Sequence, residues 1–170
     1  LIAARLTDGQ REVMLATRQG MAIRFKEDQV RPMGRTARGV TGIELEEGDA
    51  VIAMEALAPS EQGTLLTICE NGYGKRTPMD EYRLQNRGGK GIITIRTTDR
   101  NGPVVGVLQV EDGDELMLVT NRGKIIRSKV DDIRVQGRDT QGVRLISMEP
   151  DEKVVGQARL AEKEEENGEA

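Results

Sequence analysis

The chain has 170 residues, of which 36% are hydrophobic and 32% are charged, and its formal net charge at pH 7 is −4. It contains no histidine and one cysteine, Cys69, which excludes a Cys/His zinc site, a histidine-dependent catalytic triad and an internal disulfide bond. No apolar run reaches the roughly 20 residues that a membrane helix needs, and the sequence shows no signal-peptide pattern, so it predicts a cytoplasmic protein that does not enter a membrane.

The first predicted strands are short and follow one another closely. Ile2–Leu6 resembles the last strand of a repeat. An apolar run at Val13–Thr17 then meets a glycine turn, and Met21–Lys26 alternates apolar and polar residues with the period of a half-buried strand. A loop leads to a third strand after Gly39, and an acidic turn separates it from a fourth strand that starts at Val51. The sequence therefore predicts one four-stranded unit.

The same unit occurs twice more along the chain. The apolar runs recur at Leu65–Cys69 and Leu116–Thr120, and the turn glycine, the glycine before the third strand and the start of the fourth strand recur at spacings of 50 to 53 residues. Four strands in about fifty residues are typical of a propeller blade. We therefore predict an all-β, propeller-like array of about three repeats plus one strand of a fourth.

The predicted domain organisation follows from these repeats. The array forms one domain over residues 1–160, with repeats at about 11–58, 63–110 and 114–160. Residues 161–170 contain five glutamates and predict a disordered acidic tail. Between Glu149 and Ala170 there are eight acidic and three basic residues, so residues 1–148 carry 22 basic and 21 acidic ones. The body of the domain is therefore close to neutral.

Arginine occupies three equivalent positions in all three repeats. These columns are Arg24, Arg76 and Arg127; Arg31, Arg83 and Arg134; and Arg35, Arg87 and Arg138. Regularly spaced charge on a curved rim suits DNA, because phosphate contacts position a duplex without reading its sequence. An aspartate column (Asp28, Asp80 and Asp131) lies beside the second arginine column, so that column could equally brace each blade through ion pairs. The predicted DNA-binding residues are Arg24, Arg35, Arg38, Lys75, Arg76, Arg87, Lys90, Arg127 and Arg138.

A glycine-rich basic loop lies in the middle repeat. It consists of Gln85, Asn86, Arg87, Gly88, Gly89, Lys90 and Gly91. Glycine lets the backbone approach a phosphate closely, and arginine and lysine supply the opposite charge. The loop lacks the spacing and the following helix of a nucleotide-binding P-loop. It therefore predicts contact with the phosphates of a nucleic acid.

This loop resembles the gyrase A-box of the DNA gyrase A C-terminal domain, with Asn86 where that motif has arginine. The likeness continues through Val30–Gly34, Asn71–Thr77 and Gly137–Val143 and covers nearly all of residues 1–160. It implies a β-pinwheel, in which propeller-like blades exchange strands, and a fragment with roughly the last three blades and the acidic tail. The principal box is then expected upstream.

The resemblance also implies a function. The chain would bind, bend and wrap double-stranded DNA as the C-terminal part of the A subunit of a bacterial, nucleoid-associated type II topoisomerase, DNA gyrase. Wrapping would support ATP-dependent negative supercoiling by an enzyme of two A and two B subunits. ATP and Mg²⁺ would serve the whole enzyme, and we expect no cofactor, metal or catalytic residue in this chain.

Two alternatives remain open from the sequence. The C-terminal domain of the topoisomerase IV A subunit has the same implied fold, and a protein-interaction propeller would use its rim charges only for solubility. Tyr82 and Cys69 are predicted to be buried, and neither Tyr82 nor Tyr73 is expected to cleave DNA. Single-strand binding is disfavoured, because it needs aromatic stacking platforms and the chain has no tryptophan, one phenylalanine and two tyrosines.

Overall fold

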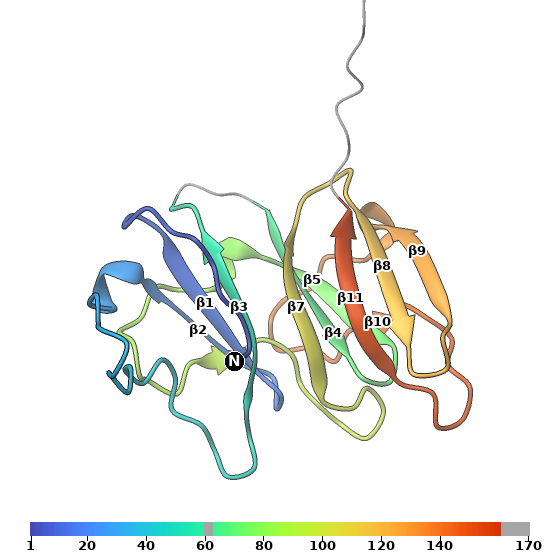
Figure 1. Ribbon diagram of the computed structural model, residues 1–170. Helices are drawn as coiled ribbons and strands as arrows, with labels where there is room; N and C mark the ends of the chain where they lie inside the picture. Colours follow the sequence, from blue (N-terminus) through green and yellow to red (C-terminus); the bar gives the residue numbers. More distant parts are fainter. Residues whose placement is uncertain (60–62, 161–170) are drawn as a thin grey trace, which may run out of the picture.

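Strands joined by tight turns and loops make up nearly all of the regular structure (Figure 1). The computed structural model describes residues 1–59 and 63–160, and the predicted tail at 161–170 lies outside them. The strands are β1 (Glu12–Thr17), β2 (Met21–Lys26), β3 (Val51–Leu57), β4 (Thr64–Cys69), β5 (Tyr73–Pro78), β6 (Ile92–Ile93), β7 (Val104–Val110), β8 (Glu115–Thr120), β9 (Ile125–Lys129), β10 (Val143–Arg144) and β11 (Val154–Leu160). Short 3-10 helices follow β2, β5 and β9, at Glu27–Gln29, Met79–Glu81 and Val130–Asp132. The predicted all-β fold is confirmed, and none of the helices in these residues could span a bilayer.

Each repeat begins with the hairpin that its sequence period predicts. β1 pairs with β2 so that Val13 lies opposite Phe25 and Leu15 opposite Ile23. β4 pairs with β5 and β8 with β9 in the same antiparallel way. The turn between β1 and β2 needs φ of +91° at Gly20, a conformation that residues with a Cβ rarely adopt. The fourth strands β3, β7 and β11 pair with the free side of β1, β4 and β8 respectively.

The outer strand of a sheet comes from the following repeat. The first sheet has the order β3-β1-β2-β6, and the second has the order β10-β5-β4-β7. Met21 lies opposite Ile93 and Ala22 opposite Ile92, and β10 takes the same place beside β5. The third sheet, β11-β8-β9, ends at β9 within the described chain. Neighbouring repeats are therefore joined by backbone hydrogen bonds as well as by the chain itself.

The first repeat departs from the sequence prediction at two places. Neither Ile2–Leu6 nor the residues after Gly39 form a strand in the described structure. A β-strand requires a neighbour for its backbone N–H and C=O groups. β6 and β10 have such a neighbour in the preceding repeat, whereas no described sheet precedes the first repeat. Even β6 and β10 are only two residues long, shorter than the β-branched sequence after each glycine predicts.

The hydrophobic core lies largely between neighbouring repeats. One buried cluster joins Met14 and Leu57 of the first repeat to Leu65 of the second, and another joins Leu66 of the second to Leu118 of the third. β3 lies against β7, and β7 lies against β11, so the three sheets stand side by side (Figure 1). The segments between the second and fourth strands consequently lie at the outer edges of the sheets. We call residues 27–44, 79–96 and 130–147 the perimeter segments.

Candidate nucleic-acid interface

Two members of the first arginine column, Arg24 and Arg76, lie at the contacts between neighbouring repeats, which we call the joints. The Arg24 guanidinium donates to the carbonyls of Met79 and Tyr82 at 3.0 and 3.1 Å, and its Nε donates to Glu12 at 2.6 Å. Arg76 Nε donates to the carbonyl of Ile133 at 2.9 Å. These contacts explain why the second strand of a repeat carries arginine at this position. Its guanidinium binds the carbonyl groups of the next repeat's perimeter segment.

The last member of this column, Arg127, lies in a different environment. No repeat follows it in the described chain, and its side chain is 63% exposed and paired with Glu115. Arg76, by contrast, is 6% exposed and reaches the solvent-exposed Asp112 at 2.6 Å. Of the first column, Arg127 is therefore the side chain most accessible to a ligand.

Lys75 is wholly buried beside the second joint. Its Nζ donates to the carbonyls of Gly137 and Arg138 in the third repeat. Burial lowers the pKa of this lysine to about 8, because the ammonium has lost solvation. Lys75 and Arg76 do not reach the perimeter surface, which corrects the expectation that they contact DNA.

Two arginines of the third column, Arg87 and Arg138, form hydrogen bonds with the preceding repeat. The Arg87 backbone N–H donates to Gln29 Oε1 at 2.7 Å, its Nε donates to the Gln29 carbonyl at 3.1 Å, and its guanidinium donates to the carbonyl of Thr41. Arg138 repeats this arrangement with Glu81 and the carbonyl of Ile93, each at 3.0 Å.

The other predicted contacts near this column differ in exposure. Arg35 and Arg38 are exposed and have no hydrogen-bond or ion-pair partner among residues 1–59 and 63–160. Lys90 is also exposed, with its Nζ 3.3 Å from Glu46 Oε1. Arg35, Arg38 and Lys90 are therefore accessible to a phosphate, whereas Arg87 and Arg138 are already engaged with protein.

The glycine-rich loop fits closely against the first repeat. Gly88 N–H donates to the Gly42 carbonyl at 2.7 Å, and the Gly89 carbonyl accepts from Glu44 N–H at 2.9 Å. A Cβ at Gly91 would overlap the carbonyl of Ala22. The glycines thus allow the loop to pack closely against the neighbouring repeat. From the sequence alone, this role could not be distinguished from a close approach of the backbone to a phosphate. Within the loop, Asn86 and Lys90 are exposed.

The second arginine column is the exposed one. Arg31, Arg83 and Arg134 lie on successive perimeter segments, and none forms a hydrogen bond or ion pair with another described residue. The bracing interpretation of this column is not supported, because no described ion pair joins it to the aspartate column. One of those carboxylates, Asp131, instead accepts from the backbone N–H of Gly113 at 3.2 Å.

A shallow hollow adjoins Arg83 on the perimeter. It has a volume of about 480 Å³ and is lined by Lys26 and Gln29 of the first repeat and by Arg83, Leu84, Gln85 and Asn86 of the second. Lys26, Arg83 and Asn86 are exposed there. The hollow therefore presents, at a junction between repeats, an amide and two cations that have no hydrogen-bond or ion-pair partner among the described residues.

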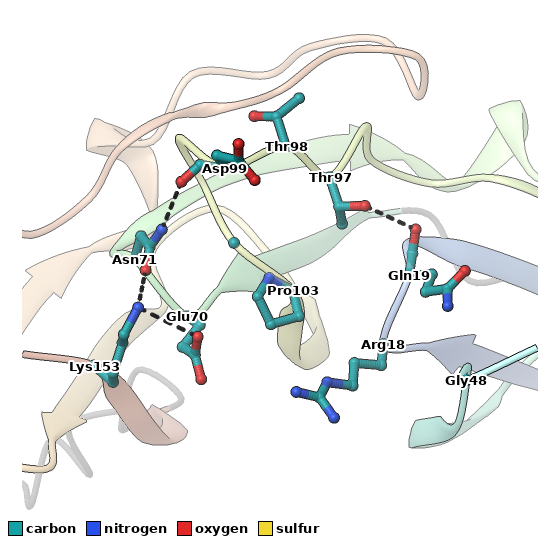
Figure 2. A pocket seen from close by; sticks show the side chains of 11 residues that line it. Arg18, Gln19, Gly48, Glu70, Asn71, Thr97, Thr98, Asp99, Pro103 and Lys153 are labelled. Carbon is teal, nitrogen blue, oxygen red and sulfur yellow. Dashed lines mark hydrogen bonds and ion pairs between the residues drawn. The ribbon is translucent and has the colours of Figure 1, made fainter. Parts of the chain in front are cut away.

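A larger hollow of about 680 Å³ lies at the turns of the hairpins (Figure 2). Lys153 Nζ donates to Asn71 Oδ1 at 2.6 Å and lies 3.4 Å from Glu70. Asn71 Nδ2 in turn donates to the carbonyl of Asp99 at 3.1 Å. Acidic and basic groups are mixed here, and these polar side chains connect the second repeat to the third. This hollow is less suited to a polyanion than the perimeter.

The tyrosines and the cysteine are buried in the described chain, as predicted for Tyr82 and Cys69. Tyr82 is 1% exposed and its hydroxyl is 2.6 Å from Thr94 Oγ1. Burial raises the pKa of Tyr82 and of Cys69 to about 12 in each case. Tyr73 lies beneath Arg100, whose guanidinium carbon is 4.9 Å from the ring centre. All three side chains are therefore packed against other groups of the protein.

A family model and the most similar relatives that we report agree on the family to which this chain is similar. A family model described as the DNA gyrase C-terminal domain, beta-propeller, matches residues 11–58, 63–111 and 114–156. The DNA gyrase A subunit of Salmonella typhimurium is 50% identical over 162 residues, which are 95% of this chain and 18% of that protein. Its Staphylococcus aureus counterpart is 48% identical over 169 residues, 99% of this chain and 19% of that protein. The chain therefore spans less than a fifth of the length of these relatives.

Two solved structures share the arrangement of sheets. The C-terminal domain of DNA gyrase A has a TM-score of 0.83 and 29% identity, covering 91% of this chain and 52% of that one. The C-terminal domain of DNA topoisomerase IV has a TM-score of 0.86 and 27% identity, covering 92% of this chain and 49% of that one. The fold is thus shared with both kinds of domain.

Proposed function

Since the chain belongs to the family of DNA gyrase C-terminal domains, we propose that it binds double-stranded DNA without sequence preference and bends it along the perimeter segments. The observation that carries this proposal is the second arginine column. Arg31, Arg83 and Arg134 offer one free guanidinium per repeat, and their exposure means that no internal contact is lost when a phosphate binds. Neutralised phosphates release counterions, which supplies affinity that is independent of base sequence.

The remaining exposed cations of the perimeter extend this surface. Arg35, Arg38 and Lys90 lie on the same segments, and Lys26 adjoins Arg83 at the shallow hollow. Arg127 is exposed at the end of the array. Charges repeated on successive repeats would hold a duplex at several points along a curved path. Such contacts offset the cost of bending DNA, which is of order 1–6 kcal/mol for a short site.

We also propose the setting in which this surface works. The relatives named above are gyrase A subunits, which supports a place within the A subunit of a bacterial, cytoplasmic type II topoisomerase that acts at the nucleoid. Wrapped DNA would then be presented for ATP-dependent strand passage and negative supercoiling. The remainder of the A subunit, together with the B subunit in an assembly of two of each, would hold the catalytic groups, ATP and Mg²⁺.

Topoisomerase IV provides the second candidate. The structural likeness to its C-terminal domain is as extensive as the likeness to the gyrase domain, with TM-scores of 0.86 and 0.83. In that setting the perimeter would still bind a duplex, but with a weaker wrap. DNA topology assays of the full-length protein in complex with its partner would separate the two, because gyrase introduces negative supercoils into relaxed DNA.

The DNA-binding proposal is tested by removing the second column. Replacing Arg31, Arg83 and Arg134 together by alanine should weaken duplex binding and reduce the slope of log affinity against log salt by roughly 2.7, at about 0.9 for each phosphate contact. Fluorescence anisotropy with a labelled duplex over a salt series measures both quantities. Energy transfer between the two ends of the duplex reports bending in the same samples.

The matched control removes three exposed arginines that lie outside the perimeter segments, Arg5, Arg18 and Arg122. This triple variant has the same net charge and is expected to keep most of the affinity, the slope and the bending. Equal losses in both variants would mean that total charge, and not the perimeter, determines binding. A salt-independent affinity in the unmodified chain would contradict phosphate contact altogether.

A further inference from the structure

An exposed apolar side chain follows each arginine of the second column. The three residues are Pro32, Leu84 and Val135, directly after Arg31, Arg83 and Arg134 in the sequence. Leu84 is 47% exposed and Val135 is 45% exposed. A single exposed leucine calls for no explanation, since much of any protein surface is apolar. The same pairing of an exposed guanidinium with an exposed apolar side chain on successive repeats does call for one.

The exposure of these side chains is a property of the repeat. The second repeat has a described neighbour on each side, and Leu84 is nevertheless as exposed as Val135 in the third repeat. Leu84 therefore remains accessible when both neighbouring repeats are in place. The two residues hold equivalent positions at the two joints, so a ligand that follows the perimeter segments would meet the same apolar group twice.

Backbone contacts with the preceding repeat hold both residues in place. Leu84 forms a parallel β-bridge with Arg24, and Val135 forms one with Arg76. The residue after each of them donates its N–H to the carbonyl of the same arginine, at 2.8 Å in both cases. The side chains of Arg24 and Arg76 bind further carbonyls of the same perimeter segments. A ligand therefore meets side chains on an ordered backbone, which keeps the entropic cost of binding low.

At the first joint the apolar side chain shares a hollow with polar groups. Leu84 lines the shallow hollow of about 480 Å³ together with Lys26, Arg83 and Asn86, among others. The three polar side chains are exposed there. A ligand that fills this hollow therefore needs negative charge, a hydrogen-bond acceptor and an apolar surface close to one another.

The minor groove of a DNA duplex offers all three. Phosphates border it, base acceptors line its floor and the deoxyribose rings form its walls. Deoxyribose belongs to every nucleotide, whereas the apolar group of the major groove is the methyl of thymine alone. An apolar contact that tolerates any base sequence must therefore be made with the sugars. Arginine, lysine and asparagine beside an aliphatic side chain are also the residues that minor-groove proteins use.

We propose that the minor groove of the duplex faces the protein at both joints, with Arg83 and Arg134 at the phosphates that border the groove and Leu84 and Val135 against its sugar walls. This inference rests on the proposed function, because it orients a duplex that is already bound along the perimeter segments. Bending toward the protein narrows the groove on the inside of the curve, and a narrow minor groove has an enhanced negative potential that attracts arginine. The orientation therefore favours the direction of bending that wrapping requires.

Removing the apolar side chains while keeping every cation tests this orientation. Leu84→Ser with Val135→Ser, in the full-length protein, should lower duplex affinity by roughly tenfold, as expected for two half-exposed aliphatic side chains that become buried. The slope of log affinity against log salt should not change, because no phosphate contact is lost. Fluorescence anisotropy with a labelled duplex over a salt series measures both quantities.

The matched control is Leu45→Ser with Val155→Ser. It removes a leucine and a valine that are 43% and 61% exposed outside the perimeter segments, and it should keep the affinity. Circular dichroism checks that both double variants are folded. An equal loss of affinity in the control overturns the proposal, since the loss would then not come from the perimeter.

Competition between groove ligands tests the same orientation without any substitution. Netropsin and methyl green are both dications, but netropsin occupies the minor groove of A·T-rich duplexes and methyl green occupies the major groove. On an A·T-rich duplex, netropsin should displace the unmodified protein at concentrations at which methyl green does not. Because the two ligands carry the same charge, a difference between them reports the groove and not the neutralisation of phosphates.

The outcomes separate this inference from the proposed function. A folded serine variant that binds as tightly as the unmodified protein overturns the minor-groove contact, and so does displacement by methyl green alone. DNA binding by the second arginine column stands in both cases. A smaller salt slope in the serine variant also overturns the inference, since cations would then have been displaced. Absence of salt-dependent duplex binding in the unmodified protein overturns the proposed function and this inference with it.

Discussion

At the scale of single residues, the arginines of the third column have different roles in successive repeats. Arg87 and Arg138 bind the preceding repeat, and Arg35, in the same column, has no partner in residues 1–59 and 63–160. The sequence identified the columns correctly as repeated features. The sequence could not show whether an arginine binds the neighbouring repeat or faces a ligand. The carbonyl groups that accept its hydrogen bonds, such as that of Thr41, lie far away along the chain and have no sequence signature.

This difference predicts unequal costs for two identical substitutions. Arg87→Ala should lower the free energy of unfolding by about 1.5–3 kcal/mol, since it removes charge-assisted hydrogen bonds to Gln29 and Thr41. Arg35→Ala should change it by less than about 0.5 kcal/mol, as is usual for an exposed residue. Urea unfolding at low protein concentration measures both. Similar losses would mean that Arg87 does not hold the joint.

A second residue-scale prediction concerns pH. Burial lowers the pKa of Lys75 in the folded chain from its ordinary value of 10.5 to about 8. Below the lower value the lysine is protonated in both states, whereas between the two values the unfolded chain binds more protons, so stability rises with pH through this window. Relative to Lys75→Met, the unmodified chain should gain on the order of 1–3 kcal/mol between about pH 7 and about pH 10. Urea unfolding across this range measures the gain, and Lys26→Met, at an exposed position, should leave the pH dependence unchanged.

At the scale of elements, the hairpins follow from local sequence and the third strands do not. Alternation in Met21–Lys26 and a glycine turn are enough to predict β2, since its partner β1 is adjacent in sequence. β6 forms because β2 of the preceding repeat provides backbone hydrogen-bond partners for it. The matching residues after Gly39 have no such neighbour in the described structure and form no strand there. Each segment begins with a glycine followed by valine or isoleucine, so the presence of a neighbour contributes to the difference between strand and loop, as does Gly42, which stands where the second repeat has Thr94.

A matched pair of glycine substitutions tests this account. Gly91 and Gly39 both have positive φ, +75° and +85°, so alanine should cost about 1 kcal/mol of backbone strain at either position. Gly91→Ala should cost more, because its Cβ would also overlap the carbonyl of Ala22, whereas Gly39 faces open space. Urea unfolding of both variants gives the difference. Equal costs would indicate that the exchanged strand contributes little to stability.

At the scale of the whole molecule, the three repeats share their sheets and cores. The buried clusters cross both joints, and β6 and β10 each complete the sheet of another repeat. Stacked repeats that contact only their neighbours are stabilised by intrinsic and interface contributions, and here the interface includes backbone pairing. No repeat in the described chain therefore has a complete sheet of its own.

Unfolding should accordingly be one transition. The chain has no tryptophan, and both tyrosines, Tyr73 and Tyr82, lie in the second repeat, so tyrosine fluorescence follows that repeat alone. Far-ultraviolet circular dichroism follows all three. The two signals should coincide during urea unfolding, since loss of either outer repeat removes pairing from the middle one. A fluorescence midpoint clearly separated from the dichroism midpoint would show that the repeats unfold independently.

Strand exchange also bears on how the protein is made. A ribosome delivers β1, β2 and β3 well before residues 92–93, which complete their sheet, so each blade must wait for the next one to emerge. Throughout synthesis the nascent chain carries one bare strand edge, of the kind that promotes aggregation. Slowing translation between β2 and β6 should therefore lower the yield of folded protein more than slowing it within a hairpin.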